Sequence, residues 1–261
     1  MICLAVFLLA FSGITNDQTF ENVNQEHSVD SDDVDLAMQN PDLFGGDMIG
    51  DFDNTKTAVP HDFELWPGGI IPYVIEEELL RSKRWRRLIS EAMSSFHENT
   101  CIRFIERTYE RDFINIFMDI GCYAQVGRSK GEHPVSLSHG CMYFGTIVHE
   151  LNHVVGFYHE QNRPDRDEYI KIFWENIKPR MEDQFVKYMP YDMRILNEFD
   201  YDSIMLYGER FFSKDGHSKT MVALKPGVRL LTVKERTGLS KSDIFRINTL
   251  YNCKKFTKNY K

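Results

Sequence analysis

The most regular pattern of apolar and polar positions lies in residues 85–96. Apolar side chains recur there at intervals of three and four residues, and Arg and Glu fill many of the positions between them. At 3.6 residues per turn, this spacing gathers the apolar side chains on one face of a helix. The pattern therefore predicts an amphipathic helix with a buried face formed by Trp85, Leu88, Ile89, Ala92, Met93 and Phe96.

Shorter apolar runs on both sides of this helix predict strands. Residues 66–69 contain one Pro and two Gly, which is typical of a turn, and the apolar run that follows predicts a strand at 70–75. Strands are also predicted at 101–106 and 113–118, and the second of these alternates so poorly that we expect an exposed edge strand. The rest of the pattern predicts loops at 121–138, a helix from about Gly145, and a closing amphipathic stretch at 243–251.

The first residues of the chain form an apolar run without a charged side chain, Met1–Phe11. The run is too short to span a bilayer as a helix. It has the length of the apolar region of a secretory signal, and small and polar residues follow it. We therefore predict a signal peptide at residues 1–16 and a secreted, extracellular protein. No later apolar run is long enough for a membrane helix.

Charge divides the chain unevenly. Residues 17–56 contain eleven acids and one base, a net charge of −10, so the overall charge of −8 leaves about +2 for the rest. An acidic segment with few aromatic residues cannot bury enough apolar surface to fold alone. Only residues 43–48 differ from this acidic composition, because they are apolar and rich in Gly around a single Asp. No basic cluster in the chain suggests a nucleic-acid partner.

Five cysteines are present, and the first, Cys3, belongs to the predicted signal. Four would remain after secretion, and an even number in an oxidising compartment predicts two disulfides. The residue types alone leave all three pairings open. The four are Cys101, Cys122, Cys141 and Cys253.

The chemistry of the chain is concentrated in one short stretch. His149 and His153 are four residues apart, so on a helix they lie on one face and can bind one metal ion. Glu150 follows the first of them, where it can take a proton from a water in the open position of the metal. Gly156 can end the helix in the left-handed conformation, and the chain then returns His159 as a third ligand.

The third histidine makes this pattern specific. H-E-x-x-H alone fixes only three positions and recurs by chance, whereas a third His six residues later, with Gly between, is hard to obtain by accident. A purely structural zinc site would more often use cysteine ligands, and no cysteine is near in sequence. Other histidines lack such spacing and are predicted to be surface residues: His61, His97, His133 and His217.

The motif resembles the signature of the astacin family of metalloendopeptidases, which belong to the metzincins. That signature, H-E-x-x-H-x-x-G-F-x-H-E-x-x-R-x-D-R-D, is matched at every specified position from His149 to Asp167. Downstream, the sequence S-I-M-L-Y is similar to the family's Met-turn. The resemblance implies one Zn²⁺ per chain, with Met205 as the floor beneath the histidines. It also implies that Tyr207 is a fifth ligand that swings away to stabilise the transition state.

The resemblance covers nearly the whole chain and implies a fold. It is an α+β fold of two subdomains, with a zinc helix and a twisted, mostly parallel sheet in the N-terminal half. The C-terminal half would be irregular, with the active-site cleft between the halves, and the peptidase domain would span 57–261. The disulfide pairing of the family would join Cys101 to Cys253 and Cys122 to Cys141.

The resemblance also gives a role to the acidic front of the chain. Residues 44–47 are similar to the family's pro-segment motif F-x-G-D, whose aspartate, here Asp47, occupies the open position of the metal. Residues 17–56 would then be a pro-segment, removed by a trypsin-like protease after Lys56. The freed amine of Thr57 would become buried near Glu160, which is thereby given a structural role. The alternative is a solubilising tail that inhibits only by covering the cleft.

These inferences predict a monomeric zinc endopeptidase that hydrolyses internal peptide bonds of proteins. Glu150 would be the general base, Tyr207 would hold the oxyanion, and the substrate would lie extended along the strand at 113–118. The competing hypothesis is an inactive, zinc-stabilised binding protein or toxin that has kept the fold. Such a protein usually loses its general base or a ligand, and this chain keeps them all.

Overall fold

The computed structural model of the protein describes residues 36–50, 62–190 and 193–254. The predicted signal peptide 1–16, the predicted cleavage site at Lys56 and the new amino terminus at Thr57 lie outside the described residues. The boundaries of the predicted segments therefore stay predictions.

A six-stranded sheet forms the N-terminal half, in the order β1-β5-β6-β4-β2-β3. All neighbouring pairs are parallel except β5 and β6, so the sheet is mostly parallel, as the family resemblance implies. The strands are β1 (Met48–Ile49), β2 (Ile70–Ile75), β3 (Arg103–Glu106), β4 (Phe113–Phe117), β5 (Cys122–Gln125) and β6 (Glu132–Leu137).

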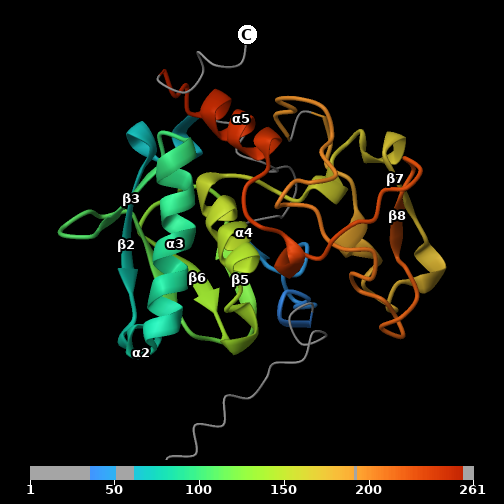
Figure 1. Cartoon of the computed structure of the whole chain (residues 1–261), viewed down its shortest axis with the longest axis horizontal. Helices are drawn as coiled ribbons and strands as arrows, with labels where there is room; N and C mark the ends of the chain where they lie inside the picture. Colours follow the sequence, from blue (N-terminus) through green and yellow to red (C-terminus); the bar gives the residue numbers. More distant parts are fainter. Residues whose placement is uncertain (1–35, 51–61, 191–192, 255–261) are drawn as a thin grey trace, which may run out of the picture.

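Two long helices lie side by side over one face of this sheet (Figure 1). The short α2 (Glu77–Arg81) leads into α3 (Lys83–Asn99), which begins where the Ser82 hydroxyl accepts a hydrogen bond from the amide of Trp85. The second long helix, α4 (Phe144–Val155), is buried along almost its entire length. Both predicted helices are confirmed. Of the predicted buried face, Ile89, Ala92, Met93 and Phe96 are buried, and Trp85 and Leu88 are partly buried.

Two predictions about the sheet were wrong. The strand predicted at 113–118 as an exposed edge is β4, which pairs on one side with β2 and on the other with β6. Residues 121–138, predicted as loops, contain β5 and β6. β5 has only four residues, and β6 contains a Pro and several polar residues, so periodicity alone did not reveal them. Because β4 is paired on both sides, the prediction that a substrate lies along 113–118 was also wrong. At that end of the sheet β1 is the outermost strand, and β5 is the strand next to it.

The C-terminal half is irregular, as expected, and its described strands are β7 (Ile170–Ile172) and β8 (Met221–Ala223). The chain then returns to the N-terminal half as α5 (Lys241–Leu250), which lies near the end of α3 (Figure 1). Asn248 donates a hydrogen bond to the carbonyl of Asn99, and a disulfide joins Cys253 to Cys101. The second disulfide joins Cys122 to Cys141, so both pairs are those of the family.

Residues 36–50, the described part of the predicted pro-segment, pack into the molecule between the two halves (Figure 1). Met48 and Ile49 form β1 and pair with β5, while Met38 and Asp47 are buried. This segment is therefore part of the packed structure, which argues against a merely solubilising tail.

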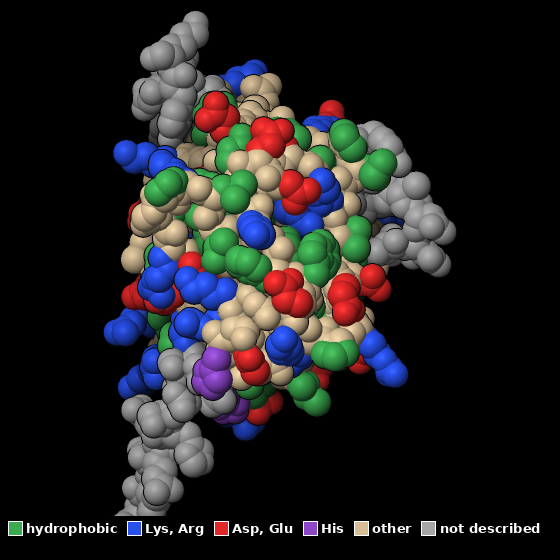
Figure 2. All heavy atoms as spheres, turned by 90° about the vertical axis from the view of Figure 1, so that its right-hand side faces the viewer, with side chains coloured by type: hydrophobic (Ala, Val, Ile, Leu, Met, Phe, Trp, Pro, Cys, Tyr) green, Lys and Arg blue, Asp and Glu red, His purple; other side chains and the backbone are tan. Residues whose placement is uncertain are grey.

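The surface of the C-terminal half carries acidic, basic and apolar side chains interspersed with one another (Figure 2). Among the described residues, no helix combines the length and the apolar character that crossing a membrane requires.

Candidate metal centre

Helix α4 carries two of the three predicted histidine ligands. His149 and His153 lie one turn apart on it, and both are completely buried. The helix ends at Gly156, whose φ of 118° lies in the left-handed region that suits glycine. Its amide donates hydrogen bonds to the carbonyls of Asn152 and His153. The turn that follows brings His159 back to the face that carries the other two histidines.

The Nε2 atoms of the three histidines converge on one point. They are 3.0 Å apart between His153 and His149, 3.1 Å between His153 and His159, and 3.2 Å between His149 and His159. Ligands of a tetrahedral zinc ion with Zn–N bonds of about 2.0–2.1 Å stand about 3.3 Å apart. The spacing of the three nitrogens therefore fits one zinc ion.

Backbone carbonyls orient two of the rings from behind. Nδ1 of His149 lies 2.8 Å from the carbonyl oxygen of Ile204, and Nδ1 of His153 lies 2.7 Å from that of Phe157. A ring that donates from Nδ1 presents the lone pair of Nε2 to the metal. Burial lowers the pKa of His159 to about 4 and also lowers the pKa of His153. These rings are therefore neutral at pH 7, the form that binds metal.

Asp47 of the predicted pro-segment completes the cluster. Its Oδ2 lies 3.1 Å from Nε2 of His149, and its Oδ1 lies 3.1 Å from Nε2 of His159. Donor atoms of all four side chains lie within 4.8 Å of one another, and all four residues are buried. Oδ1 of Asp47 has no hydrogen-bond donor among the described residues. A buried carboxylate facing three imidazoles is a donor set that fits Zn²⁺.

Two glycines let residues 44–47 approach the histidines closely. Gly45 and Gly46 have φ values of 62° and 90°, which residues with a side chain rarely adopt. A β-carbon at Gly45 would collide with the ring of His159, and one at Gly46 would collide with the carbonyl of Met38. The F-x-G-D-like motif therefore has a physical basis here, because these glycines carry the backbone to the metal centre.

Glu150 is fully buried beside the cluster, and neither of its carboxylate oxygens has a hydrogen-bond partner among the described residues. Burial and the neighbouring Asp47 raise its pKa well above the ordinary value of a glutamate. A buried polar group without a partner is destabilising, so such groups occur mainly where function requires them. The position suits a proton acceptor that waits for a water molecule.

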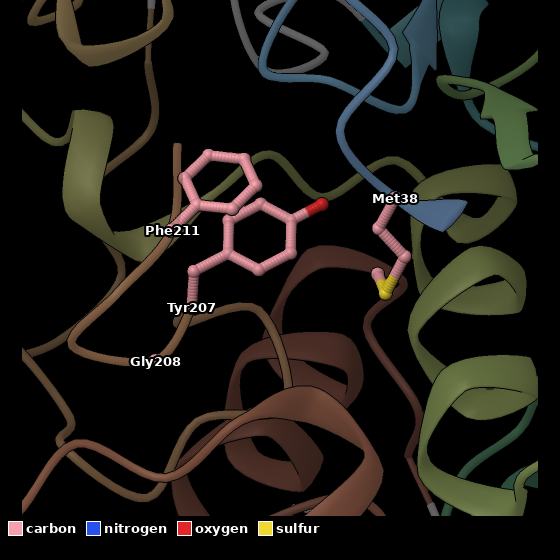
Figure 3. A pocket seen from close by; sticks show the side chains of 4 residues that line it. All are labelled: Met38, Tyr207, Gly208 and Phe211. Atoms are coloured by element: carbon pink, nitrogen blue, oxygen red, sulfur yellow. The ribbon is translucent and has the colours of Figure 1, made fainter. Parts of the chain in front are cut away.

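The segment 203–207 lies on the other side of the histidines. Met205 is buried, and its carbonyl accepts a hydrogen bond from the amide of Glu160. The hydroxyl of Tyr207 donates a hydrogen bond to Asp47, and its ring stacks on Phe211 with centroids 3.8 Å apart. Met38 of the predicted pro-segment lines a small pocket together with Tyr207, Gly208 and Phe211 (Figure 3). The structure thus brings together every predicted site residue that it describes.

Several residues that support this site were not found from the sequence. Asp243 at the start of α5 accepts hydrogen bonds from the hydroxyl of Ser203 and the amide of Ile204, at 2.7 Å and 2.8 Å. Gln161 accepts one from the amide of Tyr207. The spacing between Asp243 and Ser203 carries no periodic signal that could have revealed this contact.

Glu160 is held by buried cations that the sequence also did not reveal. Arg246 donates two hydrogen bonds of 2.8 Å to its carboxylate, and Arg163 donates a third of 3.2 Å. The amide of Asp200 donates to the same carboxylate. Glu160 therefore anchors α5 to the turn that carries His159.

One further prediction about the histidines was wrong. His133, predicted at the surface, is buried in β6 against Trp66, with ring centroids 5.0 Å apart. Its ring bonds the amide of Ser129 and the carbonyl of Phe113. His217 is exposed, as predicted, and His61 lies outside the described residues.

Comparisons with known proteins agree with this geometry. The family model described as Astacin, a family of peptidases, matches residues 58–252. Astacin-like metalloprotease toxin 1 from Loxosceles intermedia is 42% identical over 96% of this chain and 92% of its own length. Zinc metalloproteinase nas-15 from Caenorhabditis elegans is 39% identical over 83% of this chain but only 41% of its own length.

A solved structure supports the fold. High choriolytic enzyme 1, a hatching-enzyme zinc protease from the medaka fish Oryzias latipes, is similar with a TM-score of 0.65 and 40% identity, covering 78% of this chain and 98% of that one. The family match over most of the chain and these similar proteins show to which family the chain belongs. The chain belongs to the astacin family of zinc metalloendopeptidases.

Proposed function

We propose that this zinc endopeptidase is secreted as a latent precursor in which residues 36–50 block the active site. The observation that carries the proposal is the carboxylate of Asp47, buried among His149, His153 and His159. An aspartate that occupies the position needed by water and substrate would keep the precursor inactive. Removal of the segment would then activate the enzyme.

In the active form, His149, His153 and His159 would hold the zinc ion. Bound zinc supplies Lewis-acid chemistry, which lowers the pKa of water and polarises the scissile carbonyl. Glu150 takes the proton of the attacking water and passes it to the departing amine. The hydroxyl of Tyr207, released from Asp47, donates a hydrogen bond to the oxyanion.

The position of β1 supports a second mode of inhibition by the same segment. Met48 and Ile49 pair with β5 at the edge of the sheet next to α4. An extended peptide substrate binds to such an edge through its backbone, so β1 occupies the place where we expect the substrate. Ligation by Asp47 and cover by β1 therefore act together, and they can be separated only by experiment.

Activation would require a cut between the pro-segment and the domain. Lys56 is the predicted site for a trypsin-like protease, and Thr57 would become the first residue. We propose that the new amine approaches Glu160, where it would join the buried ion pairs with Arg246 and Arg163. Because that carboxylate is already paired, activation would rearrange an existing network.

Secretion is supported by the apolar run at the start of the chain and by the two disulfides. Similar proteins that are described as a toxin and as a hatching enzyme are consistent with an enzyme that acts outside the cell. The competing hypothesis of an inert binding protein has less support, because Glu150, the three histidines and Tyr207 all converge.

The test compares the purified precursor with the same protein after limited trypsin treatment, on casein, with and without a chelator. We expect the precursor to be silent and the treated protein to be active and to begin at Thr57. The chelator should abolish the activity, and added zinc should restore it. A treated protein that binds zinc without cleaving casein or a peptide library would support the inert binding protein instead.

A further inference from the structure

The side chain of Phe44, three residues before Asp47, packs on an aromatic wall of the domain. Its ring centroid lies 5.7 Å from that of Tyr188, with the planes at 31°. Tyr188 in turn meets the edge of Tyr158 at 5.3 Å. Tyr158 immediately precedes His159, so the wall adjoins the metal centre in sequence as well as in space.

The chain holds this wall in a fixed position. The amide of Tyr188 donates a hydrogen bond of 2.7 Å to the carbonyl of Asn162. The side chain of Asn162 donates two hydrogen bonds to the same loop, at 3.0 Å to the carbonyl of Gln184 and 2.7 Å to that of Val186. Asn162 ends the short turn that begins after His159. Tyr188 is therefore tied to the third histidine through one short, buried turn.

The hydroxyl of Tyr188 is buried and lacks a hydrogen-bond partner among the described residues. A buried hydroxyl that lacks a partner destabilises the state that contains it. A peptide that replaces the pro-segment could supply that partner, whereas the described part of the pro-segment that now covers Tyr188 does not.

We propose that Tyr188 and Tyr158 form an aromatic subsite of the active enzyme, which Phe44 fills in the precursor. The inference rests on the proposed release of the pro-segment. Residues 44–49 run past the histidines and then along β5, the track that a peptide substrate would follow. The subsite would therefore select substrates that carry Phe, Tyr or Trp within about three residues of the scissile bond, the separation of Phe44 from Asp47 in the chain.

The expected effect is moderate, because ring pairs of this kind add a small increment to ordinary burial. Loss of the Tyr188 ring should lower kcat/KM for a peptide with the aromatic residue by about threefold to tenfold. The hydrolysis of a matched peptide with Ala at that position should hardly change. A merely structural role of Tyr188 would instead slow both peptides alike.

The experiment uses the trypsin-activated enzyme and a peptide library derived from a proteome. Three variants are compared with the wild type: Tyr188→Ala, Tyr188→Phe, and Tyr109→Ala as a matched control at a site 89% exposed. We expect the wild type to enrich aromatic residues at one fixed position near the cut. Tyr188→Phe and Tyr109→Ala should keep that enrichment, and Tyr188→Ala should lose it.

The outcomes separate this inference from the proposed function. Cleavage without positional enrichment of aromatic residues, or enrichment that survives in Tyr188→Ala, overturns the subsite and leaves the endopeptidase intact. Absence of any cleavage by the treated wild type overturns the proposed function itself. If Tyr188→Ala fails to fold, the wild type and Tyr188→Phe are compared on paired peptides with Phe or Ala at the enriched position. Equal kcat/KM for the two peptides then overturns the proposal.

Discussion

The two walls of the metal centre are built in different ways. One wall is α4, a regular helix in which backbone hydrogen bonds fix His149 and His153 relative to each other. The other carries His159, Met205 and Tyr207 on segments without strands or long helices. Those segments are held by buried side chains that bond the backbone, above all Asp243 and Arg246 from α5.

This difference indicates where the site is robust. On the helical wall a side chain can be changed without loss of the scaffold, because the backbone does not depend on it. On the irregular wall single polar side chains hold the backbone in place of regular secondary structure. Removing one of them would leave its buried polar partner without a hydrogen bond. Substitutions on the helical wall should therefore lower catalytic activity with little loss of folding stability, whereas substitutions on the irregular wall should lower folding stability.

The largest effect is expected on the helical wall, at Glu150. Glu150→Gln and Glu150→Ala should lower kcat for a peptide by about 10²–10⁴-fold, because no group remains to accept the proton of water. Zinc content and the unfolding midpoint should stay near those of the wild type, since the carboxylate has no hydrogen-bond partner among the described residues to lose. Metal analysis, thermal unfolding and peptide hydrolysis measure the three quantities. A zinc-loaded variant within about tenfold of the wild type would remove Glu150 from the proposed role.

The next effect is expected on the irregular wall, at Arg246. Arg246→Met removes the two hydrogen bonds that the guanidinium donates to the Glu160 carboxylate. The carboxylate stays buried, and its remaining cation is Arg163, whose guanidinium nitrogen lies 3.2 Å from Oε1 of Glu160. The free energy of unfolding should fall by about 3–5 kcal/mol. The control is Arg87→Met on α3, which breaks a pair whose side chains are 72% and 52% exposed and should have no resolvable effect. Equal unfolding midpoints of the two variants in urea would contradict the contrast between the walls.

The same contrast explains what the sequence could reveal. The two long helices follow from apolar spacing, and the histidine motif follows from ligand spacing on a helix, so the helical wall was predicted almost completely. The strand β4 was predicted at the right residues but at the wrong place in the sheet, because the pattern of apolar and polar residues in a strand does not say which strands lie beside it. Asp243 and Arg246 were missed because their partners are about 40 and 86 residues away, and only the folded chain brings them together.

The smallest effect is expected behind the helical wall, at His133. Its Nε2 accepts a hydrogen bond from the amide of Ser129, so the ring must be neutral. Burial lowers its pKa, although Asp112 raises it and Arg128 lowers it slightly. Below the unfolded value of about 6.5, the unfolded chain binds the proton more readily than the folded one, so stability is lost as the pH falls through this window.

This pH effect can be isolated by a difference measurement. His133→Gln should be less stable than the wild type at pH 7.5, and the gap between the two should narrow toward pH 5. Urea unfolding of both proteins across this range gives the gap directly. A gap that is constant or widens on acidification would mean that His133 is not held neutral by the fold.

The latency proposed for the precursor depends on Asp47, which would keep the enzyme silent by occupying the metal position. The most direct measurement is the hydrolysis of a short peptide by a precursor that trypsin cannot cut, Lys56→Gln, with and without Asp47→Ala. Asp42→Ala in the same background is the matched control, because Asp42 is an exposed carboxylate of the same segment. We expect Asp47→Ala to gain activity that a chelator abolishes, while the parent and Asp42→Ala stay silent. An Asp47→Ala precursor that binds zinc and is as silent as its parent would contradict the claim and leave only cover of the cleft by β1.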